Sequence, residues 1–200
     1  NEPISSINLM ERAALACADK LMETLLYDLP VVVLAGMGNN GGDGLAMARI
    51  LHNAGRKVQV VVAHYRPEGS PDFEVNLIRA RHDRIRVVML EEGADLPDLD
   101  PRALVIDALF GTGLQRPITG WLKALVMSLN RGPNAVLALD LPSGLFVEGN
   151  TGNDAEAIVQ ADRTFTLELP KQALLLSENA RFAGEWEVVP IDLDKDFIAH

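Results

Sequence analysis

The sequence of 200 residues is long enough for one α/β domain with a well-buried core, and its hydrophobic fraction of 48% is typical of globular proteins. The net charge of −10 and the absence of any Lys/Arg cluster exclude a typical nucleic-acid binder. A single cysteine, Cys17, excludes an intrachain disulfide framework and suits the reducing cytoplasm, where we expect the protein to act. We expect no membrane partner, because no apolar stretch is long enough to span a bilayer and no signal peptide is recognisable.

Hydrophobic periodicity predicts helices and strands in alternation along the chain. The predicted elements, in order, are a helix at 5–26 capped by Ser5 or Ser6, a strand at 31–36, a helix at 42–55, a strand at 57–63, a helix at 70–83, strands at 85–90 and 103–111, a helix at 119–132, and strands at 134–140, 161–170 and 184–193. This alternation predicts an α/β fold built on a doubly wound, mostly parallel sheet with helices on both faces. No linker or internal repeat interrupts it, so we expect residues 1–200 to form a single domain, cut from or truncated relative to a longer chain.

Three predicted strands end in polar residues, at the edge of the sheet where ligands bind in doubly wound folds. Because the carboxyl ends of parallel strands meet at one edge, we expect these residues to converge on one crevice although they are far apart in the sequence. The three groups are Asn39, Asn40 and Asp43 in "GMGNNGGDG", Asp107 ahead of "GTGLQRP", and Asp140 and Ser143 in "DLPSG".

The spacing Gly36-x-Gly38-x-x-Gly41 fits the dinucleotide-binding fingerprint, but that fingerprint also expects an acidic residue at the end of the second strand. The second strand here ends "VVAHYR", without Asp or Glu, which disfavours an ordinary NAD-dependent dehydrogenase. The loop also lacks the Lys-Ser/Thr pair of a P-loop, which disfavours an ATPase. An anionic nucleotide bound to this acidic protein must then be held mainly by backbone N–H groups and helix dipoles, with Arg116 as the nearby cation.

Asp107 and Asp140 each close an apolar strand, and no Lys, Arg or His flanks either residue in the sequence. A buried carboxylate needs a partner, so either a cation or a protonated state would satisfy each of them. Asn40, Asp107 and Ser143 offer hard oxygen donors and no soft ligand cluster is present, which favours a monovalent or alkaline-earth ion over zinc or copper. Purely structural roles stay open as well, since the asparagines could form a turn and Asp43 could cap the following helix.

The motifs "LMERA", "GNNGGDG", "DALFGTGL" and "DLPSGL", in this order and spacing, resemble those of the NAD(P)H-hydrate epimerases, the YjeF N-terminal domain family. The resemblance covers nearly the whole chain, including "LPKQALLL" and "GEWEVVPIDL". It implies a Rossmann-like three-layer αβα sandwich that interconverts the R and S forms of hydrated NADH and NADPH (NADHX and NADPHX) at carbon 6 of the nicotinamide ring. It also implies an ADP- or ATP-dependent dehydratase as functional partner, which could lie on the same chain, and we expect a homo-oligomer.

The resemblance also implies the site residues. A potassium ion would be held by Asn40, Asp107 and Ser143. Among the ligand-contacting carboxylates, Asp140 is the first choice for the catalytic proton shuttle and Asp43 the second. The implied substrate-binding residues are Asn39, Asn40, Gly41, Gly42, Asp43, Gly111, Thr112, Gly113, Leu114, Gln115, Arg116, Pro117 and Asp140.

The chemistry needs no redox step. The hydroxyl sits on a carbon bonded to the ring nitrogen, so loss of water leaves a planar centre that can be hydrated again from the other face. Two other classes stay open: a non-catalytic nucleotide-binding or protein-interaction module of the same fold, and an NAD(P)-dependent oxidoreductase. The intact polar residues at the three strand ends argue against the first, and the missing ribose-binding acid argues against the second.

Overall fold

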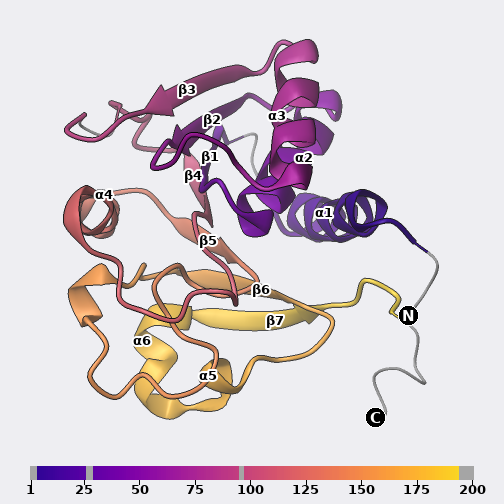
Figure 1. The fold of residues 1–200 in the computed structure, drawn as a ribbon. Helices are drawn as coiled ribbons and strands as arrows, with labels where there is room; N and C mark the ends of the chain where they lie inside the picture. The colour runs from indigo at the N-terminus through magenta and orange to yellow at the C-terminus, as the bar shows by residue number, and fades with distance from the viewer. Residues whose placement is uncertain (1–3, 26–28, 95–96, 194–200) are drawn as a thin grey trace.

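The seven strands form one parallel sheet at the centre of the molecule (Figure 1). The computed structural model describes residues 4–25, 29–94 and 97–193. The strand order is β3-β2-β1-β4-β5-β6-β7, so the chain reverses its direction of travel across the sheet between β1 and β4. The strands are β1 (Val31–Ala35), β2 (Val58–Ala63), β3 (Arg86–Leu90), β4 (Leu104–Ala108), β5 (Val136–Leu139), β6 (Arg163–Leu167) and β7 (Glu185–Val189).

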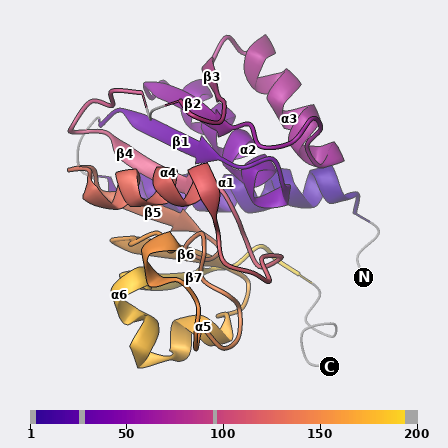
Figure 2. The same cartoon turned by 60° about the vertical axis from the view of Figure 1, so that its left-hand side comes forward.

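Helices cover both faces of the sheet, which confirms the predicted doubly wound α/β class. The first three helices lie on one face and α4 crosses the other, while the two short helices lie beside β6 and β7 (Figures 1 and 2). The helices are α1 (Ser6–Thr24), α2 (Asn39–Asn53), α3 (Pro71–His82), α4 (Gly120–Arg131), α5 (Gln172–Leu175) and α6 (Ala180–Ala183).

The central strands are buried on both faces, as expected for a parallel sheet flanked by helices. In β1, Val31 and Val33 belong to the core under α1–α3, whereas Val32 and Leu34 belong to the core under α4. Alternate side chains therefore feed two separate hydrophobic layers, and β-branched valines suit this pleated, fully buried setting. Because all seven strands are parallel, their carboxyl ends lie along the same edge of this buried sheet.

Helix α2 begins three residues earlier than its hydrophobic pattern predicts. The helix starts at Asn39. Its N-cap is Gly38, so no N-cap side chain accepts a hydrogen bond from the first N–H groups of the helix. Asp43 consequently lies in the second turn, so the reading of Asp43 as an N-cap is wrong. The glycine-rich sequence conceals this start because glycine is a poor helix former when judged alone.

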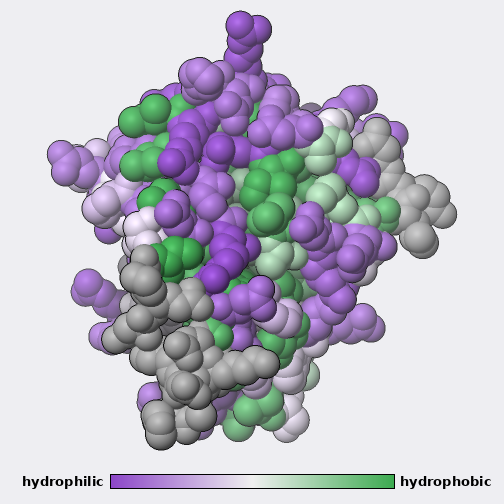
Figure 3. Space-filling view, turned by 90° about the vertical axis from the view of Figure 1, so that its right-hand side faces the viewer, coloured by the Kyte–Doolittle hydropathy of each residue, from purple (hydrophilic) through white to green (hydrophobic). Residues whose placement is uncertain are grey.

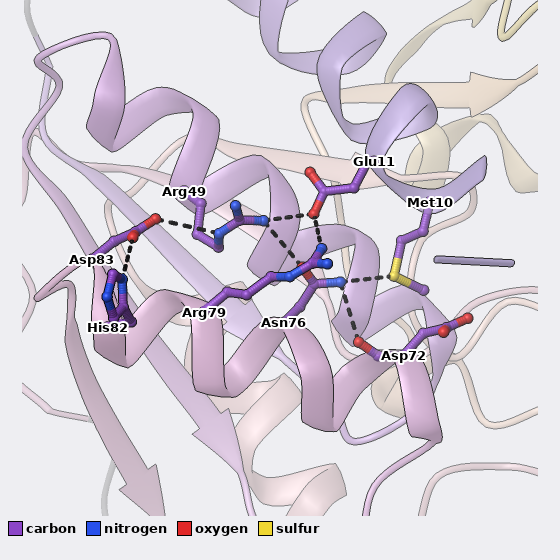
Figure 4. Close-up of polar contacts among 8 residues, drawn as sticks. All are labelled: Met10, Glu11, Arg49, Asp72, Asn76, Arg79, His82 and Asp83. Atoms are coloured by element: carbon purple, nitrogen blue, oxygen red, sulfur yellow. Dashed lines mark hydrogen bonds and ion pairs between the residues drawn. The ribbon is translucent and has the colours of Figure 1, made fainter. Parts of the chain in front are cut away.

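A network of polar side chains ties α1, α2 and α3 together (Figure 4). The Glu11 carboxylate on α1 lies 2.6 Å from Nη1 of both Arg49 on α2 and Arg79 on α3. Arg49 also donates to the amide oxygen of Asn76 at 3.2 Å, and Asn76 in turn donates to the sulfur of Met10. These contacts hold α1, α2 and α3 in fixed positions relative to one another.

No helix in the described part of the chain is long and apolar enough to cross a bilayer. Apolar residues on the face shown in Figure 3 gather in small groups among hydrophilic ones. The homo-oligomer expected from the sequence thus stays a prediction.

Candidate active site

A cavity of about 620 Å³ opens at the carboxyl edge of the sheet, where the ends of β1, β2, β4 and β5 meet. It lies across the point where the strand order reverses, which is where doubly wound folds bind ligands. The lining residues are Gly38, Asn39, Asn40, Asp43, Tyr65, Arg66, Ser70, Leu109, Phe110, Gly111, Thr112, Gly113, Leu114 and Asp140.

Eight of the residues implied as substrate-binding line this cavity, and five do not. Gly41 and Gly42 are buried in helix packing, and Gln115 instead lines a neighbouring cavity of about 360 Å³. Arg116 and Pro117 are exposed on the loop that follows β4. The eight lining residues are Asn39, Asn40, Asp43, Gly111, Thr112, Gly113, Leu114 and Asp140.

Asp107, at the end of β4, is fully buried and accepts hydrogen bonds from protein groups. Its Oδ2 accepts from the Ser143 N–H at 2.8 Å, and its Oδ1 accepts from the Ser143 hydroxyl at 2.6 Å and the Leu109 N–H at 3.2 Å. Burial raises the pKa of Asp107 from 3.8 to about 6, and these hydrogen bonds limit the rise. The stability linked to this group is therefore present below pH 3.8 and lost as the pH rises through about 6, unless a cation compensates the charge.

Hard oxygen atoms gather beside Asp107. The Ser143 hydroxyl lies 2.6 Å from Asp107 Oδ1 and 3.1 Å from the Phe110 carbonyl oxygen, yet a hydroxyl can donate its proton to only one of them. The shorter, charge-assisted bond goes to Asp107, and the Ser143 oxygen itself accepts the Phe110 N–H at 2.8 Å. The Asn40 amide donates to the Phe110 carbonyl at 3.0 Å, and its own oxygen accepts no hydrogen bond within the described residues. All three residues implied as potassium ligands thus meet around Phe110.

Asp140 follows β5 in the left-handed backbone region, with φ of 65°. Its Oδ1 lies 2.6 Å from Nζ of Lys171 and accepts the Leu167 N–H at 3.1 Å. The Lys171 ammonium also donates to the carbonyls of Leu167 and Leu169, at 2.8 and 3.1 Å, so its three donors are all used. Of the two alternatives left open by the sequence, a cation or a protonated state, the structure thus shows a cation beside Asp140. Local sequence could not reveal this partner, because Lys171 follows the next strand.

Asp43 has a different environment. Its side chain is half-buried against the cavity and accepts no hydrogen bond from the described residues. Desolvation, followed by the charges of Asp140 and Asp72, raises the pKa of Asp43 well above its usual value. Burial also raises the pKa of the nearby Cys17 thiol to about 12, with Asp43 and Asp140 adding to the effect, so this buried thiol is a poor nucleophile.

Sequence reasoning missed six lining residues: Gly38, Tyr65, Arg66, Ser70, Leu109 and Phe110. The Tyr65 hydroxyl accepts the Met37 N–H at 3.2 Å, and its ring centroid lies 5.6 Å from that of Phe110. The Arg66 guanidinium lies 5.6 Å above the Tyr65 ring centroid and donates to the Met37 carbonyl. Arg66 is thus an exposed cation that lines the cavity, whereas Arg116 is exposed and does not line it. In the sequence, the letters "HYR" directly after β2 place this arginine at the carboxyl edge of the sheet.

The comparison with protein families decides the relationship. Residues 6–173 match the model described as "YjeF-related protein N-terminus". The chain belongs to this YjeF N-terminal family. Its relatives include an NAD(P)H-hydrate epimerase of Oenococcus oeni, which is 35% identical over 191 residues that span 95% of this chain and 88% of the relative. A bifunctional NAD(P)H-hydrate repair enzyme of Salinibacter ruber is 38% identical over 204 residues, which span 95% of this chain but only 37% of that enzyme.

A solved structure shares the fold of this YjeF N-terminal domain. The crystal structure of a yeast protein superposes with a TM-score of 0.76 at 25% identity, covering 93% of this chain and 79% of the yeast chain. The predicted Rossmann-like αβα architecture is thereby confirmed.

The site of this YjeF N-terminal domain places two carboxyl groups in unlike settings around one cavity. Asp140 is paired with a cation, whereas Asp43 is desolvated and has no cationic partner among the described residues. Such divergence is how a protein assigns one carboxyl group as a charged partner and another as a proton carrier. Within the described residues, no group of three or more His, Cys, Asp or Glu is arranged to hold a metal ion, so any cation there relies mainly on neutral oxygen atoms.

Proposed function

We propose that this chain is an NAD(P)H-hydrate epimerase, an isomerase that interconverts the R and S hydrates of NADH and NADPH at carbon 6 of the nicotinamide ring. The observation that carries the proposal is the pair of unlike carboxyl groups, Asp43 and Asp140, facing one cavity in a chain whose relatives are named for this activity. The same observation argues against a non-catalytic binding module, because binding alone requires no proton carrier.

The reaction needs a proton donor and a counter-charge. Asp43, whose pKa is raised by desolvation, gives its proton to the hydroxyl on carbon 6, and the carbon–oxygen bond breaks to release water. The lone pair of the ring nitrogen forms the carbon–nitrogen double bond, leaving a planar iminium. Water then adds to the opposite face and returns a proton to Asp43. Every atom and proton is accounted for, and no electron acceptor is needed.

Asp140 supports this step by charge. The Asp140 carboxylate stabilises the positive charge that develops on the ring. Lys171 and the Leu167 N–H fix the orientation of this carboxylate. This division of labour reverses the order that sequence alone gave, in which Asp140 was the preferred proton shuttle. The reversal follows from the ion pair to Lys171, because a carboxyl group without a nearby cation is the better proton donor at neutral pH.

The donor set fits a potassium ion. Asn40, Asp107, Ser143 and the Phe110 carbonyl offer only hard oxygen atoms with a single negative charge, which suits a monovalent cation. When bound, potassium would supply positive charge and fix the loop after β4 beside the cavity. It would also compensate the buried charge of Asp107, which otherwise costs stability above its pKa.

We expect potassium to raise the melting temperature of the wild-type protein by about 3–5 °C when it is present at about ten times its dissociation constant. Asp107→Asn should abolish this rise, because it removes the one charged ligand. The matched control is Asp162→Asn, since Asp162 also accepts a backbone N–H, from Val136, at the other end of the sheet. Melting is followed in potassium and in choline chloride. A potassium-dependent rise that survives Asp107→Asn would remove Asp107 from the site.

Lys171→Met should lower kcat about tenfold or more with little change in KM, because it leaves Asp140 without its fixed orientation and charge. Lys171→Arg should restore most of kcat. Steady-state kcat and KM of both variants check this, and an unchanged kcat in Lys171→Met would contradict the assigned role.

The activity itself is tested with the isolated R hydrate of NADPH. The wild-type chain should convert it to the mixture of both forms, followed by chromatography, without any change in the reduced-nicotinamide absorbance. A change in that absorbance would indicate an oxidoreductase instead. Binding of the hydrate without conversion would favour the non-catalytic module. The bifunctional relatives further support a proposed coupling to an ADP- or ATP-dependent dehydratase that consumes the S form.

A further inference from the structure

Arg66 is exposed but lines the cavity, and contacts to the turn between β1 and α2 hold its side chain there. Its guanidinium stacks on Tyr65 and donates to the Met37 carbonyl, while Tyr65 is itself held by the Met37 N–H and by Phe110. Within the described residues this is the guanidinium's one hydrogen bond, so most of its donors are available to a ligand. A stacked, anchored guanidinium is well prepared to bind a phosphate in a forked geometry.

The strand order places Arg66 far from the reacting ring. Arg66 follows β2, whereas Asp140 follows β5, and the sheet order β2-β1-β4-β5 separates them by three strand spacings, or roughly 14 Å. If the nicotinamide ring lies between Asp43 and Asp140, as the proposed function requires, Arg66 contacts a more distant part of the dinucleotide.

The start of α2 lies between these two ends. Gly38, the N-cap, has no side chain, and the first N–H groups of the helix receive no side-chain cap. A Cβ at Gly38 would meet nothing within 4 Å, so the approach to these N–H groups is open at the cavity wall. Helix N-termini in this position of doubly wound folds take the pyrophosphate. The adenosine ribose then falls one strand further out, at the end of β2.

The residue type at that place sets the choice between the two dinucleotides. In doubly wound folds a carboxylate at the end of β2 binds the ribose 2′-hydroxyl, whereas an arginine accommodates a 2′-phosphate. No acid occupies His64 to Arg66, and the Ser70 hydroxyl, at the N-cap of α3, lines the same cavity. The site is otherwise acidic, with Asp43, Asp72 and Asp140 nearby, so a phosphate dianion needs this local cation.

We propose that Arg66 binds the 2′-phosphate of the adenosine ribose and that this chain prefers hydrated NADPH over hydrated NADH. The inference rests on the proposed function for the identity of the reacting ring. It does not depend on the proton-transfer residues.

The experiment compares kcat/KM for the two hydrates in wild type and in Arg66→Gln. The wild type should favour hydrated NADPH by about tenfold or more, and Arg66→Gln should remove most of that preference while changing the rate with hydrated NADH little. The matched control is Arg102→Gln, because Arg102 is exposed and paired with Asp100 just before β4, at the other end of the sheet. Arg116→Gln is the rival variant and should leave the preference unchanged.

Three results would overturn the inference. These are a wild type without preference for hydrated NADPH, an equal loss with both hydrates in Arg66→Gln, which would put the arginine on the pyrophosphate, and a loss of preference in Arg116→Gln alone. Calorimetric titration with NADP⁺ and NAD⁺ separates this inference from the proposed function. If neither hydrate is epimerised but NADP⁺ binds more tightly through Arg66, the proposed function fails and the phosphate site stands.

Discussion

Asp140→Asn is expected to lower kcat for epimerisation about 100-fold or more while leaving the fold intact. Asparagine keeps an oxygen that can accept the Leu167 N–H, and it tolerates the left-handed backbone that Asp140 adopts at φ of 65°. What the substitution removes is the negative charge beside the developing iminium. Because charge of this kind counts mainly in the transition state, kcat should fall far more than KM rises.

The matched control is Asp192→Asn. Asp192 also has a left-handed φ, of 53°, but it is exposed and does not line the cavity. The control should therefore keep both its melting temperature and its kcat. Rates with isolated R hydrate, together with circular dichroism melts, give the comparison. Near wild-type turnover by Asp140→Asn would exclude a charged role for Asp140, and a collapsed melting temperature would mean that the loss of rate reports unfolding.

The sequence predicts the layers of this fold well because β1 and β2 are rich in valine and helices such as α1 and α4 have an apolar face. The misplaced start of α2 shows the limit of that method. Between Asn39 and Gly44 the helix is built from glycines and polar residues, and only their packing against β1 and β4 makes the segment helical. Propensity gives no hint of a helix whose stability comes from tertiary contact.

Some residues of the candidate site could be grouped from the sequence, and others could not. Asn40, Asp107 and Ser143 could be grouped because each follows a strand, and the topology brings strand ends together. Lys171 and Arg66 also follow strands, but their positions in the sequence do not reveal which partner each side chain contacts. Lys171 reaches Asp140 by folding back over the carbonyls of its own loop, and Arg66 enters the cavity through its stack on Tyr65. Both are set by side-chain geometry that no spacing encodes.

The glycines of "GMGNNGGDG" and "GTGLQRP" also have different structural roles that their spacing does not distinguish. A Cβ at Gly41 would stand 1.8 Å from the Gly36 carbonyl oxygen, whereas a Cβ at Gly38 or Gly113 would meet nothing within 4 Å. Gly113 moreover has no left-handed φ. The loop after β4 therefore does not depend on glycine at position 113 for its backbone conformation. The close packing of α2 against the end of β1, by contrast, requires glycine at position 41.

Gly41→Ala should accordingly destabilise the protein by about 3 kcal/mol or more, at or beyond the upper end of what overpacking a core by one methyl group costs. The reason is that the clash is with backbone. Gly36 directly follows β1 and its amide donates to the Ala108 carbonyl on β4, so neither partner can move aside. Gly38→Ala, with an ordinary φ of −96°, should cost only the small penalty of an alanine N-cap. Urea unfolding of both variants, followed by circular dichroism, measures the difference through the midpoints at constant slope. If Gly41→Ala unfolds at the wild-type midpoint, α2 is not seated on β1 through this glycine, and the rigid placement of Asn40 and Asp43 on which the proposed chemistry depends would need another cause.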